Sequence, residues 1–363
     1  MILHLLQSLE KDKIVSNIMK ISIISFTLKG SILGKKLKER LNIQGHYANS
    51  FSIPKFASKL GLIKIEESLT EWTSKQFQKV EGIIFIGACG IAVRAIAPFV
   101  KDKKTDPAVV VIDEKGEFVI PILSGHIGGA NDIAQEISRI LKATAVITTA
   151  TDVNNKFSVD TFATKENLYI SDMKLVKRIS SEILEDKIIG LSSDYKILTK
   201  LPVGIEETTT KDLGICISIH NKNPFANTLN LIPRIVTLGI GCRRNTTLEA
   251  IESLVSKVLN NHIISIKSIK NISSIDLKKN EEGILDFCEK YKLDFLTYTS
   301  EELNKVKGDY SESPFVKSIT GVGNVCERSA VVGSNNGKLI INKNSENGVT
   351  VAIAVSDWSV SFE

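Results

Sequence analysis

Several features that would narrow the function of a 363-residue chain are missing from this one. Its five cysteines form no C-x-x-C pair and its histidines no H-x-x-x-H pair, which excludes a local zinc motif and argues against a disulfide framework. We therefore predict no protein-bound metal and a reducing, cytoplasmic environment. No run reaches the roughly 18 unbroken apolar residues that a membrane span needs, so no membrane partner is expected.

Charge of either sign is also not in large excess. Lys and Arg number 46 against 41 Asp and Glu, a net charge of +5 that suits an anionic small molecule but is too weak to indicate nucleic acid binding. Hydrophobic residues make up 43% of the chain and charged residues 24%, which is typical of a soluble globular protein. The length predicts two or three compact units.

The order of apolar segments predicts a multi-domain α/β protein. Residues 1–19 read as an extension without signal-peptide features, and Met19, directly before the first strand, is an alternative start. Strands alternate with helices over residues 20–158, which predicts a Rossmann-like open sheet with helices on both faces. A less regular middle region follows over residues 159–232, and a smaller C-terminal α/β domain over 233–363.

Some local expectations are specific enough to be checked. Residues 108–113 and 117–123 are expected to be two strands around a turn at 114–116. Other strands are expected at 20–27, 82–86, 144–149, 235–238, 293–298, 338–342 and 349–355. Irregular structure is expected between residues 42 and 81, a linker at 227–233, a loop at 239–244, and a capping box formed by Thr246 and Glu249.

Four loops that follow apolar strands carry polar or charged side chains. In an open α/β sheet the ligand crevice lies at the carboxyl ends of the strands, so we expect these loops to line one cleft. The first loop contains Gly87 and Gly90, with Arg94 one turn into the next helix. An arginine in this apolar helix would be costly without a partner, which favours an anionic ligand; the alternative is tight packing with Arg94 solvated. Cys89 fits a small buried residue better than a nucleophile.

The second and third loops contain the residue types of acid–base chemistry. The second combines a hydroxyl, an imidazole, an amide and three glycines at a helix start: Ser124, Gly125, His126, Gly128, Gly129 and Asn131. It is either an anion cradle with a general base or a turn capped by Ser124 or Asn131. The third contains Thr148, Thr149 and Asp152, and Asp152 would orient a histidine, bind a substrate donor or cap the next segment.

The fourth loop carries two guanidinium groups suited to bidentate capture of carboxylates. It contains Gly239, Gly241, Arg243 and Arg244, and the alternative is a solvated charge pair. Glu327, early on a predicted helix, is a weaker fifth candidate. None of these loops is a nucleotide fingerprint, because Gly239-x-Gly241 lacks a third glycine and no G-x-x-x-x-G-K-[ST] is present.

Residues 85–98, 104–108, 123–131 and 147–152 resemble the signature of the cobalamin biosynthesis protein G family, the cobalt-precorrin-5A hydrolases. The C-terminal part is similar to the third domain of that family over residues 238–244, 275–278 with Glu281, and 323–330. The resemblance spans about residues 20–355 and is densest over 83–152, whereas the middle segment matches only loosely.

The resemblance implies hydrolysis of a cobalt-containing contracted tetrapyrrole. Water would open its δ-lactone and a two-carbon fragment would leave as acetaldehyde, giving cobalt-precorrin-5B. No protein cofactor is implied, because the cobalt enters with the substrate. The many carboxylates of such a ring would account for Arg94, Arg243 and Arg244, and the implied partner is this anionic ring, with a homodimer left open.

As a hypothesis for the mechanism, His126 oriented by Asp152 activates water, and N–H groups near Gly128 and Gly129 hold the oxyanion. Ser124 is a further catalytic candidate of the same loop. The competing class is a carrier that binds a tetrapyrrole intermediate without chemistry. A methyltransferase of the same pathway is disfavoured, because no S-adenosylmethionine loop is recognisable.

Overall fold

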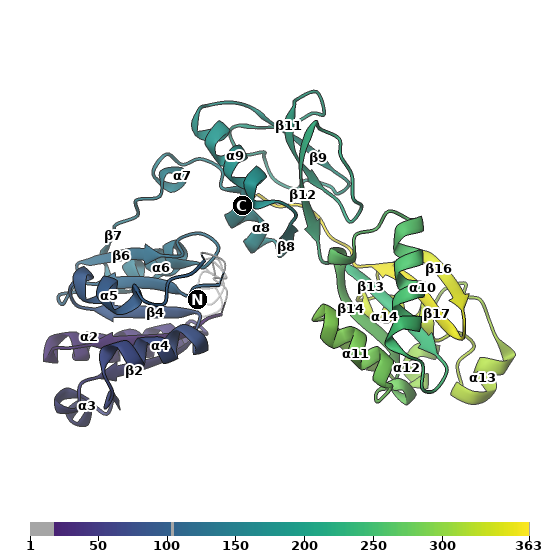
Figure 1. Cartoon of the computed structure of the whole chain (residues 1–363), viewed down its shortest axis with the longest axis horizontal. Helices are drawn as coiled ribbons and strands as arrows, with labels where there is room; N and C mark the ends of the chain where they lie inside the picture. Colours follow the sequence, from purple (N-terminus) through teal and green to yellow (C-terminus); the bar gives the residue numbers. More distant parts are fainter. Residues whose placement is uncertain (1–17, 103–104, 363) are drawn as a thin grey trace, which may run out of the picture. The chain divides into compact units, whose positions relative to one another are not determined.

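The computed structural model describes residues 18–102 and 105–362, and the chain divides after Asn155 into two compact units (Figure 1). The expected extension lies outside the described residues except for Ile18 and Met19. No helix of the described part is both long and apolar enough to cross a bilayer.

The first unit is built on a seven-stranded sheet in the order β3-β2-β1-β4-β5-β6-β7. Its strands are β1 (Lys20–Ser25), β2 (Tyr47–Ser52), β3 (Ile63–Lys64), β4 (Gly82–Ile86), β5 (Ala108–Ile112), β6 (Phe118–Leu123) and β7 (Thr144–Ala145). Its helices are α2 (Leu28–Ile43), α3 (Pro54–Leu60), α4 (Leu69–Lys79), α5 (Cys89–Ile96), α6 (Ala130–Leu141) and α7 (Ala150–Val153). Strands β1 to β5 pair in parallel, β6 runs antiparallel to β5, and β7 runs parallel to β6.

Helices cover both faces of this sheet, as the alternating side chains of buried strands require. On one face, Ile21 and Ile23 of β1 belong to a core cluster that also contains apolar side chains of α2 and α6. On the other face, Ile24 of the same strand belongs to a cluster with Trp72 of α4 and Ile96 of α5. The predicted Rossmann-like open sheet is confirmed.

The prediction of irregular structure between residues 42 and 81 is wrong, because β2, α3, β3 and α4 lie there. Strand β2 has the sequence Tyr-Ala-Asn-Ser-Phe-Ser, whose polar residues hide its pairing with β1. Helix α4 begins at a capping box in which Ser68 and Glu71 exchange hydrogen bonds. The strand expected at 144–149 is shorter than predicted, because β7 ends after two residues.

The second unit begins with a five-stranded sheet in the order β10-β9-β11-β12-β8. Its elements are α8 (Val159–Lys165), β8 (Leu168–Ile170), α9 (Met173–Leu184), β9 (Ile189–Ser193), β10 (Ile205–Glu207), β11 (Leu213–Ile217) and β12 (Asn227–Pro233). The linker expected at 227–233 is therefore wrong: these residues form a strand between β11 and β8, with Leu229 and Leu231 fully buried. The chain end returns here, where Val360 pairs with Ile197 and Phe362 stacks on Phe162.

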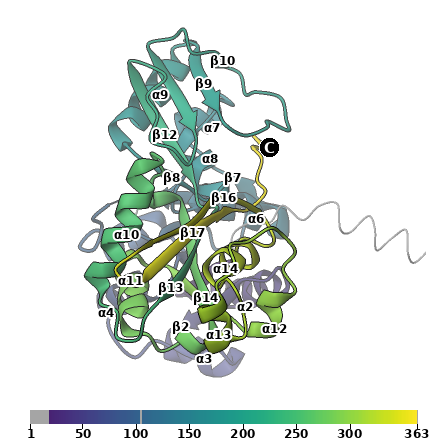
Figure 2. The same ribbon diagram turned by 90° about the vertical axis from the view of Figure 1, so that its right-hand side faces the viewer.

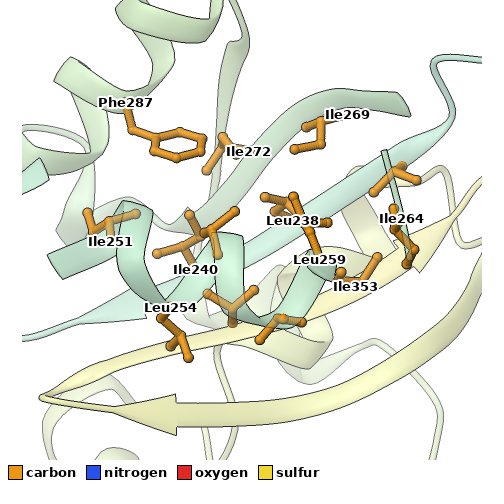
Figure 3. Packing of buried hydrophobic residues seen from close by; sticks show 14 of the residues in the cluster. Leu238, Ile240, Ile251, Leu254, Leu259, Ile264, Ile269, Ile272, Phe287 and Ile353 are labelled. Atoms are coloured by element: carbon orange, nitrogen blue, oxygen red, sulfur yellow. The ribbon is translucent and has the colours of Figure 1, made fainter. Parts of the chain in front are cut away.

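The C-terminal domain has a second five-stranded sheet, in the order β15-β14-β13-β17-β16. Its elements are β13 (Val236–Cys242), α10 (Leu248–Asn261), η1 (Ile266–Ser268), β14 (Ile269–Ile275), η2 (Asp276–Lys278), α11 (Glu282–Tyr291), β15 (Asp294–Tyr298), α12 (Ser300–Asn304), α13 (Pro314–Thr320), α14 (Cys326–Gly333), β16 (Lys338–Glu346) and β17 (Val349–Val355). Helices α10 and α11 pack on one face of the sheet, where Leu238, Ile240 and Ile353 meet Ile251 and Phe287 (Figure 3). Helix α14 packs on the other face (Figure 2).

Two local expectations for this domain are corrected. Strand β13 continues to Cys242, so Gly239 and Gly241 lie in the strand rather than in a loop. A Cβ on Gly239 would lie 1.8 Å from the carbonyl oxygen of Cys326, so this glycine lets α14 approach the sheet. The N-cap of α10 is Thr247, whose side chain accepts from the Ala250 N–H, rather than Thr246.

Candidate functional site

The loop after β6 folds tightly because its glycines leave room for neighbouring atoms. A Cβ on Gly128 would lie 2.4 Å from the Cβ of Ser124, and one on Gly125 would lie 2.9 Å from Oδ1 of Asn131. Ser124 and Gly129 both have positive φ angles, of 56° and 80°, which turn the chain into α6. The glycine-rich sequence thus places His126 between the end of a strand and the start of a helix.

His126 and Asp152 meet in this structure. Nε2 of His126 lies 2.9 Å from Oδ2 of Asp152, and the two side chains are 17% and 33% exposed, so solvent reaches both. The Nδ2 group of Asn131 donates to the same Oδ2 at 3.0 Å and to Oγ1 of Thr149 at 2.8 Å. Residues of the β6 loop, the start of α6 and the start of α7 therefore form one hydrogen-bonded cluster.

Thr151 is a member of this cluster that we did not single out from the sequence. Its Oγ1 lies 3.2 Å from Nε2 of His126, and the residue is 6% exposed. Its position in the run Thr-Thr-Ala-Thr-Asp could have indicated this role, because the two other threonines and the aspartate of that run are candidate site residues. When Nε2–H donates to Asp152, the lone pair of the neutral ring is on Nδ1.

Ser124 faces another part of the unit. Its Oγ donates to the carbonyl oxygen of Asp106 at 3.0 Å, and Ser124 and Asp106 are 8% and 7% exposed. Oδ2 of Asp106 in turn accepts from the Lys101 N–H at 2.7 Å. Ser124 therefore ties the loop after β6 to the segment before β5, and its hydroxyl donates to this carbonyl rather than to His126.

The expectation that all four loops line one cleft is wrong within the first unit. Because β6 is antiparallel to β5, its carboxyl end lies beside the start of β5, where Leu123 pairs with Val109. The loop with Gly87 lies at the other end of β5, where the Gly87 N–H donates to Ile112 O at 2.8 Å. The length of one strand, about 15 Å, thus separates the Gly87–Gly90 loop from the His126 cluster.

The expectation that Arg94 is buried in an apolar helix and needs an anionic partner is wrong. It lies on the exposed side of α5, so no burial cost demands a partner. Its Nη1 is 3.5 Å from the carbonyl oxygen of Gly90 in the preceding turn. A role of Gly87, Gly90 and Arg94 in substrate binding stays a prediction.

In the C-terminal domain, three of the four residues of the fourth loop line a cavity of about 850 Å³. They are Gly241, Arg243 and Arg244, whereas Gly239 packs against α14. Arg243 lies over the turn between β16 and β17, where a Cβ on Gly348 would be 2.8 Å from its Cδ. The Arg243 N–H donates to Gly348 O at 3.0 Å, which fixes the arginine at the cavity wall.

Glu327 supports loops beside this cavity and does not line it. It is 1% exposed, and its carboxylate accepts from the Ser311 N–H at 3.1 Å, Asn324 Nδ2 at 2.6 Å and the Lys343 N–H at 2.7 Å. These donors belong to three separate segments, so the buried carboxylate joins them. Contact between Glu327 and a substrate stays a prediction.

The two thiols that line the cavity are not activated. Burial raises the pKa of Cys242 above its usual value and raises that of Cys326 to about 11. Both are therefore protonated near neutral pH and poor nucleophiles. Within residues 18–102 and 105–362, no group of three or more His, Cys, Asp or Glu side chains is placed to hold a metal ion.

Three family models match successive parts of the chain. Residues 71–152 match the family described as Cobalamin synthesis G N-terminal, residues 157–233 match Cobalamin biosynthesis central region, and residues 236–354 match Cobalamin synthesis G C-terminus. A protein of Salmonella typhimurium named cobalt-precorrin-5A hydrolase is 34% identical over 349 residues, which is 93% of this chain and 97% of that one. A Priestia megaterium protein of the same name is 34% identical over 298 residues, 77% of this chain and 79% of that one.

Among solved structures, a cobalamin biosynthesis protein G homolog from Sulfolobus solfataricus is 26% identical, covers 93% of this chain and 97% of its own, and has a TM-score of 0.41. The sequence relatives match at more than 30% identity over nearly their full length or most of it. The chain therefore belongs to the cobalamin biosynthesis protein G family and has a role in cobalamin biosynthesis.

Proposed function

We propose that this protein is a cobalt-precorrin-5A hydrolase that opens the δ-lactone of its substrate and releases acetaldehyde, giving cobalt-precorrin-5B. The observation that carries the proposal is the His126–Asp152 pair, 2.9 Å apart and open to solvent, in a chain whose curated relatives are named as this hydrolase. Cobalt is part of the substrate.

The cluster supports general-base catalysis by His126. With its ring oriented by Asp152, His126 takes a proton from water, and the water oxygen forms a bond to the lactone carbonyl carbon. Asp152 then stabilises the imidazolium, while Asn131 holds the carboxylate in place through the same oxygen.

Collapse of the tetrahedral intermediate breaks the ring C–O bond and leaves an alkoxide and a carboxylic acid, whose proton passes to solvent. The alkoxide then forms the carbonyl of acetaldehyde as the adjacent C–C bond breaks. The electron pair of that bond passes to the macrocycle, which takes up the proton held by His126, so no external oxidant or reductant is needed.

Gly128 is the better donor for the oxyanion of this intermediate. The Gly129 N–H already donates to His126 O at 2.9 Å within the turn. The Gly128 N–H has no backbone acceptor among the described residues. The sequence suggested the N–H groups near Gly128 and Gly129 as donors to the oxyanion, and in this proposal the Gly128 N–H is that donor.

Incubation of the protein with cobalt-precorrin-5A tests the function directly. We expect stoichiometric acetaldehyde, measured by reduction with alcohol dehydrogenase and NADH, together with a product mass that has gained one water and lost one acetaldehyde. A carrier would bind the ring and release no acetaldehyde. That result would overturn the hydrolase and favour the carrier, which the absence of His, Asp and Glu from the lining of the C-terminal cavity also suits.

A further inference from the structure

The cavity of the C-terminal domain lies where ligands bind in α/β sheets. Parallel strands β13 and β14 both end at it, and η2, α13 and the turn between β16 and β17 complete its wall. Its volume of about 850 Å³ is in the upper part of the range of roughly 300–1,000 Å³ found for small-molecule sites. The cavity therefore has room for a large ligand.

The charge of the lining selects an anion. Arg243, Arg244, Lys278 and Lys343 contribute to the wall, and no Asp or Glu does. Lys278 is paired with Glu281 at 2.8 Å, but neither arginine has a carboxylate partner in the described part of the chain. Two consecutive arginines in the lining match a ligand with more than one carboxylate.

Another part of the lining is apolar and exposed. Phe315 and Ile319, four residues apart on α13, line the cavity and are 73% and 62% exposed, and Leu277 is 65% exposed. No residue of α13 is buried. Apolar side chains gathered at a cavity without cover are typical of a binding surface.

Helix α13 is held by hydrogen bonds at its base and by Val316, which packs against a small core cluster. The Ser313 N–H donates to Gly323 O at 2.9 Å, and Asn324 Nδ2 donates to Ser311 O at 2.9 Å. These bonds close the loop that carries the helix, while Phe315 and Ile319 stay free of core contacts. A ligand between this helix and the arginines would contact both.

We propose that this cavity docks a flat tetrapyrrole polycarboxylate, with ring-edge carboxylates on Arg243 and Arg244 and the ring face against Phe315 and Ile319. The choice of a tetrapyrrole rests on the proposed function, whereas the cationic and apolar walls are properties of the cavity itself. A small polycarboxylate would leave the α13 surface uncovered. A flat ring with carboxylates at its edge satisfies both walls at once.

The test is binding of cobalt uroporphyrin III, a stable octacarboxylate ring, to the full-length protein, followed by the shift of its Soret band. Arg243→Ala/Arg244→Ala should weaken binding by about ten- to a hundredfold, and Phe315→Ser/Ile319→Ser by about tenfold. Lys270→Ala/Lys305→Ala, which removes the same charge from exposed positions outside the cavity, should change binding less than about twofold. Amide exchange should slow at residues 241–244 and 314–325 when the ring binds.

Two competitors identify the ligand class. A cationic N-methylpyridyl porphyrin of similar ring size should not displace the bound ring. Tricarballylate, a small tricarboxylate, should displace it only at far higher concentration. Equal affinity for tricarballylate and the ring would reduce the cavity to an anion site and overturn the proposal, as would unchanged binding in both double variants.

The outcomes for binding and for turnover are independent. Normal acetaldehyde release with no ring bound in this cavity would refute the docking site and leave the hydrolase standing. Ring binding that depends on both walls, without acetaldehyde release by the wild-type protein, would refute the hydrolase and leave the docking site standing.

Discussion

The His126 cluster and the C-terminal cavity use polar side chains in opposite ways. In the cluster, His126, Asn131, Thr149 and Asp152 direct their polar atoms at one another over 2.8–3.0 Å. In the cavity, Arg243 and Arg244 have no acidic partner among the described residues and share the lining with exposed apolar side chains. The first arrangement fixes one ring nitrogen in place, whereas the second leaves charge available over a wide surface.

The first arrangement suits catalysis and the second suits binding of the substrate ring. A general base needs one orientation and one tautomer, which a hydrogen-bonded network provides. A ring with carboxylates along its edge needs several cations and an apolar face, and these need less exact placement. The following variants test whether the two regions divide the work in this way.

The largest effect is expected from His126→Ala. Loss of a general base lowers kcat by about 10²–10⁴-fold, with the melting temperature little changed because the side chain is partly exposed. Acetaldehyde release measures the turnover, and His262→Ala, an exposed histidine of the other unit, is the matched control. Turnover within a few-fold of wild type would remove His126 from the mechanism.

Gly239→Ala should destabilise the C-terminal domain by about 3–5 kcal/mol, because the new methyl group would overlap Cys326 O and push α14 from the sheet. Gly241→Ala, two residues along the same strand, should cost only about 1 kcal/mol, since its Cβ meets a side-chain oxygen of Thr350 that rotates away. Urea unfolding measures both. Equal costs would contradict the assignment of Gly239 to packing and Gly241 to the cavity wall.

Asn131→Ala should lower kcat by about tenfold and leave KM unchanged, because Asn131 positions Asp152 through one charged hydrogen bond. Asn131→Asp places a second carboxylate beside the first, which stabilises the imidazolium, so the acid limb of the kcat profile should move to higher pH. Asn154→Ala, whose amide bonds the Ala150 carbonyl oxygen, is the control. An unmoved pH profile would leave Asn131 with a structural role only.

The smallest effect is expected at Glu281, which is paired with Lys278 of the cavity lining. Burial opposes ionisation of Glu281, but the hydrogen bonds from Lys278 and from the Thr246 N–H outweigh it and hold the pKa below its ordinary value of 4.5. Because the folded-state pKa is the lower one, this stabilisation is present above the unfolded-state pKa and is lost as pH falls through the folded-state pKa.

Glu281→Gln should therefore destabilise the protein by about 1 kcal/mol at pH 7, and the difference from wild type should shrink as the pH falls below about 4. Urea unfolding across this pH range measures it, with exposed Glu301→Gln as the control. A difference that stays constant with pH would show that the Glu281 charge does not hold the loop.

Part of the fold follows from short-range sequence features. Strand β4 lies at the expected residues 82–86, and α10 buries Ile251, Leu254 and Val258 as their spacing predicts. Elements were missed where polar residues are paired by tertiary contacts, as in β2 and β12. Their buried residues are read as strand only when the neighbouring strands are known.

The direction of β6, which places the His126 loop away from the Gly87 loop, could have been predicted from the sequence. The turn at 114–116 was expected, and in the structure Gly116 has a φ of 74° and Asp113 Oδ1 accepts from the Glu117 and Phe118 N–H groups. A tight turn makes β6 antiparallel to β5, so its carboxyl end cannot join those of β4 and β5. The sequence already contained this consequence.

The sequence alone determined the α/β class, the helix and strand periodicity, the family resemblance and the presence of His126, Asp152 and the arginines in glycine-rich stretches. These depend on residues close in the chain, whose spacing sets which face is apolar. Only the tertiary structure decided that Asp152 meets His126, that Arg94 is solvated, that Glu327 is buried and that Arg243 lines a cavity that also has apolar residues in its wall. Those outcomes depend on packing between distant segments, which local residue patterns do not encode.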